Sequence, residues 1–97
     1  MLKSLTSLLS LAATLMPVSA IAQRQQAVPF GCDALGKDRC YFRIYYSSGG
    51  TRNFTMGSKE RDRIPGIFVG RDRYCVSVNS PIKEPCSKRT VNGTYNN

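Results

Sequence analysis

The chain contains no histidine and no tryptophan. Histidine is the side chain most often used for acid–base chemistry near neutral pH, and without it Ser-His and Cys-His nucleophile pairs are excluded. Phosphate loops, dinucleotide fingerprints and nucleophile elbows are also missing from the sequence. These absences predict that the protein is not an enzyme and uses no cofactor.

Carboxylates are scarce, with six Asp and Glu residues in the whole chain. A small hydrolase that uses Glu60, Asp62 or Asp72 is the catalytic alternative. Glu60 and Asp62 lie among basic neighbours, which lower a carboxyl pKa, whereas a catalytic acid usually needs a raised one. Asp72 stands between two arginines and is typical of a turn. We therefore expect Glu60 and Asp62 to lie in a charge-balanced surface loop and Asp72 to lie in a turn.

Apolar runs long enough to cross a bilayer, which takes about 20 residues, are also missing from the sequence. A short apolar run over 5–16 follows Lys3 and precedes the small-x-small site Ala20-Ile21-Ala22. This pattern predicts a signal peptide over 1–22 and a mature chain that is secreted or periplasmic, with no membrane span. The alternative is that this segment is kept as a membrane anchor. The hydroxyl residues within the run, and Pro17 directly after it, make that alternative less favourable.

Four cysteines follow the leader, and an oxidising compartment favours disulfides. We expect the local pairs Cys32–Cys40 and Cys75–Cys86, each stabilising the fold by about 2.5 to 3 kcal/mol in the chain-entropy estimate. The pairing Cys40–Cys75 with Cys32–Cys86 remains open as an alternative. Structural zinc sites favour closer cysteine pairs than these, so no metal site is expected.

Three segments have the residue pattern of strands. Residues 40–48 alternate, with Phe42 and Ile44 on one face and Tyr41 and Arg43 on the other. The dipeptide Gly49-Gly50 favours a tight turn, so residues 40–56 are predicted to form a β-hairpin. Residues 67–69 and 74–79 are predicted to form two further strands.

The segments between and around these strands are predicted to be loops. Residues 23–29 are polar and end in proline, which indicates a loose leader, and residues 57–63 form a charged connection. Ile64-Pro65-Gly66 is typical of a type II turn. Residues 80–86 hold two prolines and cannot form a central strand. Residues 87–97 are expected to be a loose tail or a last small hairpin.

The expected fold class is all-β, a small antiparallel meander of three to four short strands stapled by two disulfides. It forms a single domain over 23–97, because so short a chain supports only one thin core. The expected core residues are Phe42, Ile44, Tyr46, Phe54, Ile67, Phe68, Val69, Val76 and Val78.

Positive charge dominates, with 14 Lys and Arg residues in the whole chain. Lys3 belongs to the leader, so 13 remain against six acidic residues, and the mature chain has a net charge of +7. Nine of the 13 are arginine, whose planar fork suits carboxylates and phosphates. Such a surface predicts an anionic partner, although solubility alone would also account for the charge.

Two surfaces are candidates for binding. The exposed face of the first strand presents a stripe of Tyr41, Arg43 and Tyr45, which Arg52 across the hairpin would extend. The segment over 59–73 places four further arginines near apolar residues that would enter a partner's cleft. Ordinary cross-strand packing is the alternative for the stripe, and burial of the apolar residues under the sheet is the favoured alternative for the segment. The candidate residues are Tyr41, Arg43, Tyr45, Arg52, Arg61, Arg63, Arg71 and Arg73.

The sequence as a whole predicts a small exported cationic binding module whose ligand is an acidic protein or an anionic envelope glycan. The alternative is a secreted antimicrobial or toxin-like effector that acts on anionic membranes. No nucleic-acid partner is expected, because no recognised binding motif for nucleic acid is present.

Overall fold

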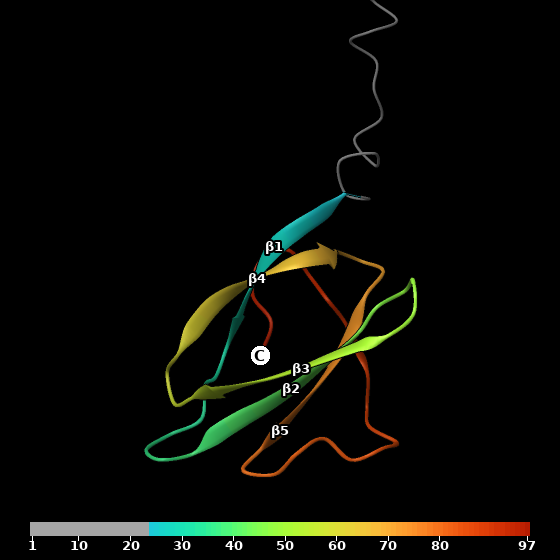
Figure 1. Cartoon of the computed structure of the whole chain (residues 1–97). Coiled ribbons are helices and arrows are strands. Elements are labelled where there is room, and N and C mark those ends of the chain that lie inside the picture. The colour runs from blue at the N-terminus through green and yellow to red at the C-terminus, as the bar shows by residue number, and fades with distance from the viewer. Residues whose placement is uncertain (1–23) are drawn as a thin grey trace, which may run out of the picture.

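A computed structural model describes residues 24–97, which fold into six β-strands and no helix (Figure 1). The predicted signal peptide over 1–22 lies outside the described residues. The strands are β1 (Gln25–Gly31), β2 (Arg39–Tyr45), β3 (Thr51–Gly57), β4 (Arg61–Phe68), β5 (Arg73–Val78) and β6 (Arg89–Thr90). The expected fold class is confirmed: the strands are short, the sheets are antiparallel, and two disulfides link the chain.

The predicted β-hairpin is present as β2 and β3, which pair in register from Arg39 with Gly57 to Tyr45 with Thr51. The connection covers residues 46–50 and is longer than a two-residue turn. Gly49 and Gly50 both have positive φ, at 103° and 87°. A side chain at either position would be strained, so the two glycines permit the reversal.

Two sheets enclose the core (Figure 1). The larger sheet has the strand order β3-β2-β5-β6, and the smaller one pairs β1 with β4. Phe30 of β1 is fully buried between them, with its ring edge-on to those of Phe42, Phe54 and Tyr74 at centroid distances of 5.4 to 5.6 Å. Edge-to-face packing of this kind stabilises a core beyond the area it buries.

The prediction of a loose leader over 23–29 is wrong, because Gln25 to Gly31 form β1. Val28 and Phe30 are buried, and β1 pairs antiparallel with β4. Pro29 fits because β1 is a strand of a two-stranded sheet, where a missing N–H donor is tolerated. The carbonyl of Pro29 accepts hydrogen bonds from the backbone and side-chain nitrogens of Asn96.

The predicted turn at Ile64-Pro65-Gly66 is also wrong, since all three residues lie within β4. Gln26 pairs with Ile67 and Val28 with Ile64, so β4 has one extra residue at this point. Gly66 has a φ of 76°, as expected where a β-bulge needs a left-handed residue. The proline and glycine therefore produce a bulge, and the partner strand keeps the chain extended.

Residues 87–97 form neither a loose tail nor a hairpin of their own. Arg89 and Thr90 pair with β5, and Val91 is fully buried in the core. The Asn96 side chain is also fully buried and bonds to Asn92 and Pro29, so every polar atom of its amide is used. The last residues thus fasten β1 to the rest of the domain.

The predicted core is right at its centre and incomplete elsewhere. Phe42, Ile44 and Ile67 are fully buried, while Phe68 is half-buried. Val78, the last residue of β5, is 51% exposed. Four other predicted residues are partly buried against the core: Tyr46, Phe54, Val69 and Val76. The buried hydrophobic residues that the sequence did not identify are Val28, Phe30, Cys32, Cys40, Met56, Ile64, Tyr74, Cys75 and Val91.

The cysteine pairs Cys32–Cys40 and Cys75–Cys86 are confirmed, with S–S distances of 2.09 and 2.02 Å. These two bonds exclude the crossed pairing, and no cysteine in the described part of the chain is free. Disulfides persist in oxidising compartments, so these two indicate an extracytoplasmic environment.

Candidate binding surface

The outer face of the larger sheet, which is turned away from the core, carries the predicted stripe. Tyr41, Arg43 and Tyr45 alternate with buried Phe42 and Ile44 along β2, as the period of a strand requires. All three stripe residues are half-buried. Residues paired across a ladder share a face, so the neighbours of the stripe on this face are Thr51, Asn53 and Thr55 of β3 and Arg73, Cys75 and Ser77 of β5.

The stripe is partly covered by the strap, as we name residues 80–86. The disulfide from Cys75 to Cys86 fixes its far end. Glu84 of the strap accepts hydrogen bonds from the Tyr45 hydroxyl and from Nη1 of Arg43, the latter at 3.0 Å. Just beyond the strap, the ammonium group of Lys88 lies 4.6 Å from the ring centroid of Tyr45. Arg43 and Tyr45 therefore serve to hold the strap.

These contacts shift the pKa values of the groups involved. The hydrogen bond from Tyr45, together with Arg43 and Lys88, lowers the pKa of Glu84 below its usual 4.5. The pKa of Tyr45 is raised by loss of solvent and by the carboxylate of Glu84. The guanidinium of Arg43 is held more firmly protonated by the same carboxylate. All three shifts favour the charge state in which the strap is attached.

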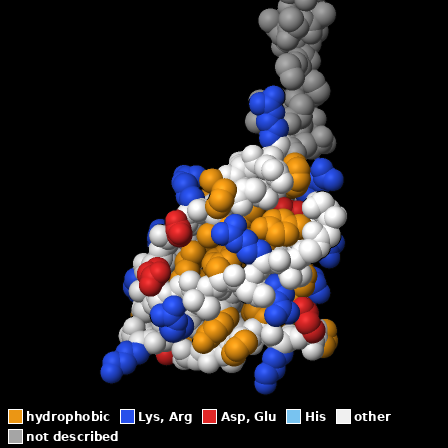
Figure 2. Space-filling view, in the orientation of Figure 1, with side chains coloured by type: hydrophobic (Ala, Val, Ile, Leu, Met, Phe, Trp, Pro, Cys, Tyr) orange, Lys and Arg blue, Asp and Glu red, His pale blue; other side chains and the backbone are white. Residues whose placement is uncertain are grey.

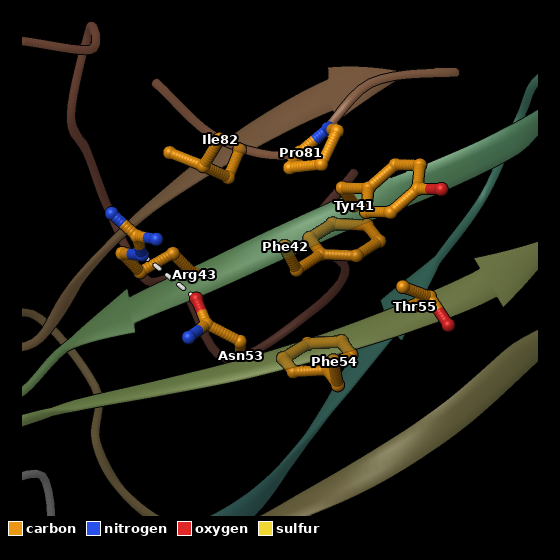
Figure 3. A pocket seen from close by; sticks show the side chains of 8 residues that line it. All are labelled: Tyr41, Phe42, Arg43, Asn53, Phe54, Thr55, Pro81 and Ile82. Atoms are coloured by element: carbon orange, nitrogen blue, oxygen red, sulfur yellow. Dashed lines mark hydrogen bonds between the residues drawn. The ribbon is translucent and has the colours of Figure 1, made fainter. Parts of the chain in front are cut away.

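The strap and the hairpin border the outer groove, an open hollow of about 490 Å³ (Figure 3). Pro81 and Ile82 form one side, and Asn53 and Thr55 of β3 form the other. The residues that line it are Tyr41, Phe42, Arg43, Asn53, Phe54, Thr55, Pro81 and Ile82. A second hollow, on the smaller sheet and lined by Pro29, Arg61, Asp62 and Arg63, is smaller, at about 390 Å³.

Arg39 lies beside the groove, next to Thr55, although the sequence did not identify it. Its position on β2 places it on the same face as Tyr41, and its Nη2 donates to Oγ1 of Thr55 at 3.2 Å. Arg43 lies at the opposite end and donates from Nε to Oδ1 of Asn53 at 2.7 Å. Tyr41 thus has a guanidinium on either side along its strand.

Arg52 does not extend the stripe. It pairs with Ile44, whose side chain is buried, so Arg52 lies on the core side of the sheet at the exposed edge formed by β3. Residues on opposite faces of a strand cannot form one surface. Arg73 does join the stripe, because it pairs with Tyr45.

The basic segment over 59–73 is not a protruding loop. Most of it is β4, and its residues Ile64 and Ile67 are buried, which confirms the favoured alternative. Arg61 and Arg63 are exposed on the smaller sheet, and the guanidinium of Arg61 lies 4.7 Å from the centroid of the Tyr95 ring. Arg71 lies in the turn after β4, over the ring of Phe68. Cationic side chains accordingly lie at several separate places on the visible face (Figure 2).

Glu60, Asp62 and Asp72, the three carboxylates of the hydrolase alternative, lie apart from the outer groove. Glu60 and Asp62 are exposed, and Asp62 accepts a hydrogen bond from the backbone of Arg63. Asp72 is fully buried, and its two oxygens accept hydrogen bonds of 2.8 Å from the backbone nitrogens of Ser47 and Phe68. Asp72 therefore joins the hairpin connection to the end of β4 and is closed to a substrate.

Among residues 24–97 no group of His, Cys, Asp and Glu side chains is arranged to hold a metal ion. The same part of the chain has no helix with the length and apolarity that crossing a bilayer takes. No protein-family model, curated protein or solved structure matches the chain. A functional proposal must therefore be based on the residues themselves.

Proposed function

We propose that this protein is a secreted or periplasmic cationic binding module for an anionic partner, an acidic protein or an anionic glycan. The observation that carries the proposal is the small number of internal ion pairs. Of the 13 Lys and Arg residues after the leader, only Arg43 and Lys88 pair with a carboxylate in the described structure, and both reach Glu84. The positive charge of the other 11 is left for a partner.

Binding without catalysis is favoured by the placement of the acidic groups. The buried carboxylate of Asp72 is occupied by the backbone, and the exposed Glu60 and Asp62 have no histidine or thiol beside them. No cofactor, nucleic acid or membrane span enters the proposal.

The test is titration of the oxidised protein with anionic and neutral polymers at two salt concentrations. Poly-glutamate and polygalacturonate should bind at 10 mM salt, whereas uncharged dextran should not. Binding should weaken strongly at 150 mM salt, because the Debye length falls from about 30 Å to about 8 Å. Absence of binding to every anionic polymer at the lower salt concentration would refute the proposal.

A second function, action on anionic membranes, is favoured by one observation. Leu35 and Val78 are the exposed large hydrophobic side chains of the described residues, at 71% and 51% exposure. Lys37 and Arg39 are close to Leu35 in sequence, a combination suited to an anionic bilayer surface. The protein should then release dye from phosphatidylglycerol vesicles, and Leu35→Ser should reduce that release. Retention of the dye at micromolar protein would exclude this function.

A further inference from the structure

The outer groove combines an aromatic surface with a surplus of hydrogen-bond donors. Asn53 accepts from Arg43 through its Oδ1 atom, so its amide nitrogen keeps its hydrogens for a ligand. The hydroxyl of Thr55 accepts from Arg39 and keeps its own hydrogen to donate. No hydrogen bond among residues 24–97 involves the hydroxyl of Tyr41. Such a donor set matches a ligand rich in acceptor oxygens.

Arg43, which lines the groove, and Arg39, which lies beside it, differ in their charge balance. Arg43 is paired with Glu84, so its charge is largely compensated. Arg39 is exposed and forms no ion pair in the described structure. A guanidinium binds a carboxylate through two parallel hydrogen bonds where its fork is free. The guanidinium that forms no ion pair is therefore that of Arg39, next to Thr55, and the anionic group of a ligand belongs there.

A ligand over β2 meets side chains, because the backbone of this strand is already paired. β2 is a central strand, and its peptide groups are paired with β3 on one side and β5 on the other. An extended peptide gains much of its affinity from backbone hydrogen bonds at a sheet edge, which the central strand β2 does not offer. A saccharide needs only a flat apolar surface for its ring and polar side chains for its hydroxyl groups. The ring of Tyr41, beside Pro81 and Ile82, supplies that surface (Figure 3).

We infer that the outer groove binds a carboxylate-bearing saccharide of the uronate class, with a sugar ring against Tyr41 and the carboxylate at Arg39. This inference rests on the proposed binding function and assigns it to one site. Arg43 and Tyr45 are positioning residues in this assignment, because they hold the strap that forms one side of the groove.

The test compares the binding of galacturonate oligosaccharides to the oxidised protein and to matched variants at 50 mM salt. Tyr41→Ala should weaken binding about tenfold, the loss expected when a stacked ring loses its aromatic partner, and Tyr41→Phe should retain most of the affinity. Arg39→Gln should weaken binding about fivefold, as an exposed charge pair allows. Arg61→Gln removes the same charge from the smaller sheet and should leave the affinity nearly unchanged. Each variant is first checked for two disulfides by non-reduced mass mapping and for folding by its NMR spectrum.

Three outcomes would overturn the inference. An equal loss in Arg39→Gln and Arg61→Gln, with none in Tyr41→Ala, would show binding by net charge alone and would leave the proposed function intact. Poly-glutamate binding that exceeds the saccharide and depends on Tyr41 would identify an acidic peptide as the occupant. Absence of binding to both probes in the unmodified protein would refute the proposed function as well.

Discussion

The inner and outer faces of the larger sheet are held by different means. The inner face packs aromatic rings around Phe30, and the buried disulfide Cys32–Cys40 belongs to the same core. The outer face is covered in part by the strap, which Cys75–Cys86 and the exposed carboxylate of Glu84 hold in place. Stability is therefore concentrated on one face and the groove on the other. Changes to the outer face should alter binding more than folding.

The largest loss of stability is expected on the inner face, from Phe30→Ala. This change removes a fully buried ring that contacts three others, and such truncations cost about 3 to 5 kcal/mol. Urea unfolding followed by circular dichroism measures the loss. Leu35→Ala, at a side chain 71% exposed, is the control and should change stability by less than about 0.5 kcal/mol. Equal losses in the two variants would contradict the position of the core.

Removing each disulfide in turn compares the two faces, because Cys32–Cys40 belongs to the inner face and Cys75–Cys86 to the outer one. Their loops span 8 and 11 residues, so loop closure alone gives each about 2.5 to 3 kcal/mol. Double substitution of Cys32 and Cys40 by alanine should cost more, because both side chains are also packed in the core. The same change at Cys75 and Cys86 should cost less in urea unfolding and should abolish saccharide binding by releasing the strap. A larger loss of stability from the change at Cys75 and Cys86 than from the change at Cys32 and Cys40 would contradict the contrast between the faces.

Asp72 should behave as part of the inner structure although it is charged. Asp72→Ala leaves two backbone N–H groups without an acceptor, and we expect a loss of about 2 to 3 kcal/mol. Asp62→Ala is the matched control, since this exposed carboxylate accepts only from the next residue. A thermal shift assay on both variants distinguishes them. A similar small shift in both would show that the buried carboxylate is dispensable.

The smallest effect on stability is expected at Glu84, where it should depend on pH. The pKa of Glu84 is lowered in the folded state, so its contribution is present above the usual carboxyl pKa and is lost as the pH falls through the lowered value. The unmodified protein should lose this part of its stability in acid, and Glu84→Gln should show a flatter decline. Urea midpoints between pH 7 and pH 2 measure the difference. Parallel pH profiles would show that the strap is not held by this carboxylate.

The strands predicted from sequence are those whose pattern is local. The alternation over 40–45, followed by Gly49-Gly50, sufficed to predict the β2–β3 hairpin. β1 was missed because its strand conformation depends on β4 and on Asn96, which are distant in sequence. The residues Pro65-Gly66 were misinterpreted for the same reason, since only the partner strand distinguishes a bulge from a turn.

The candidate site was predicted in part. Alternation placed Tyr41, Arg43 and Tyr45 on one face, and the structure confirms that placement. The strap could not be placed over them from sequence, because a proline-rich segment has no period that reveals its neighbours. One signal was available: Cys86 was predicted to pair with Cys75, which lies on the same face of the sheet as Arg43. Following that link would have brought Glu84 close to the stripe.

Ligand binding in the outer groove can be located residue by residue by mapping NMR chemical shifts during titration with galacturonate oligosaccharides. We expect saturable changes in the amide signals of Tyr41, Thr55 and Ile82, with small changes at Arg61 and Arg71. Changes spread evenly over the arginines of both sheets, or confined to β4, would contradict this expectation.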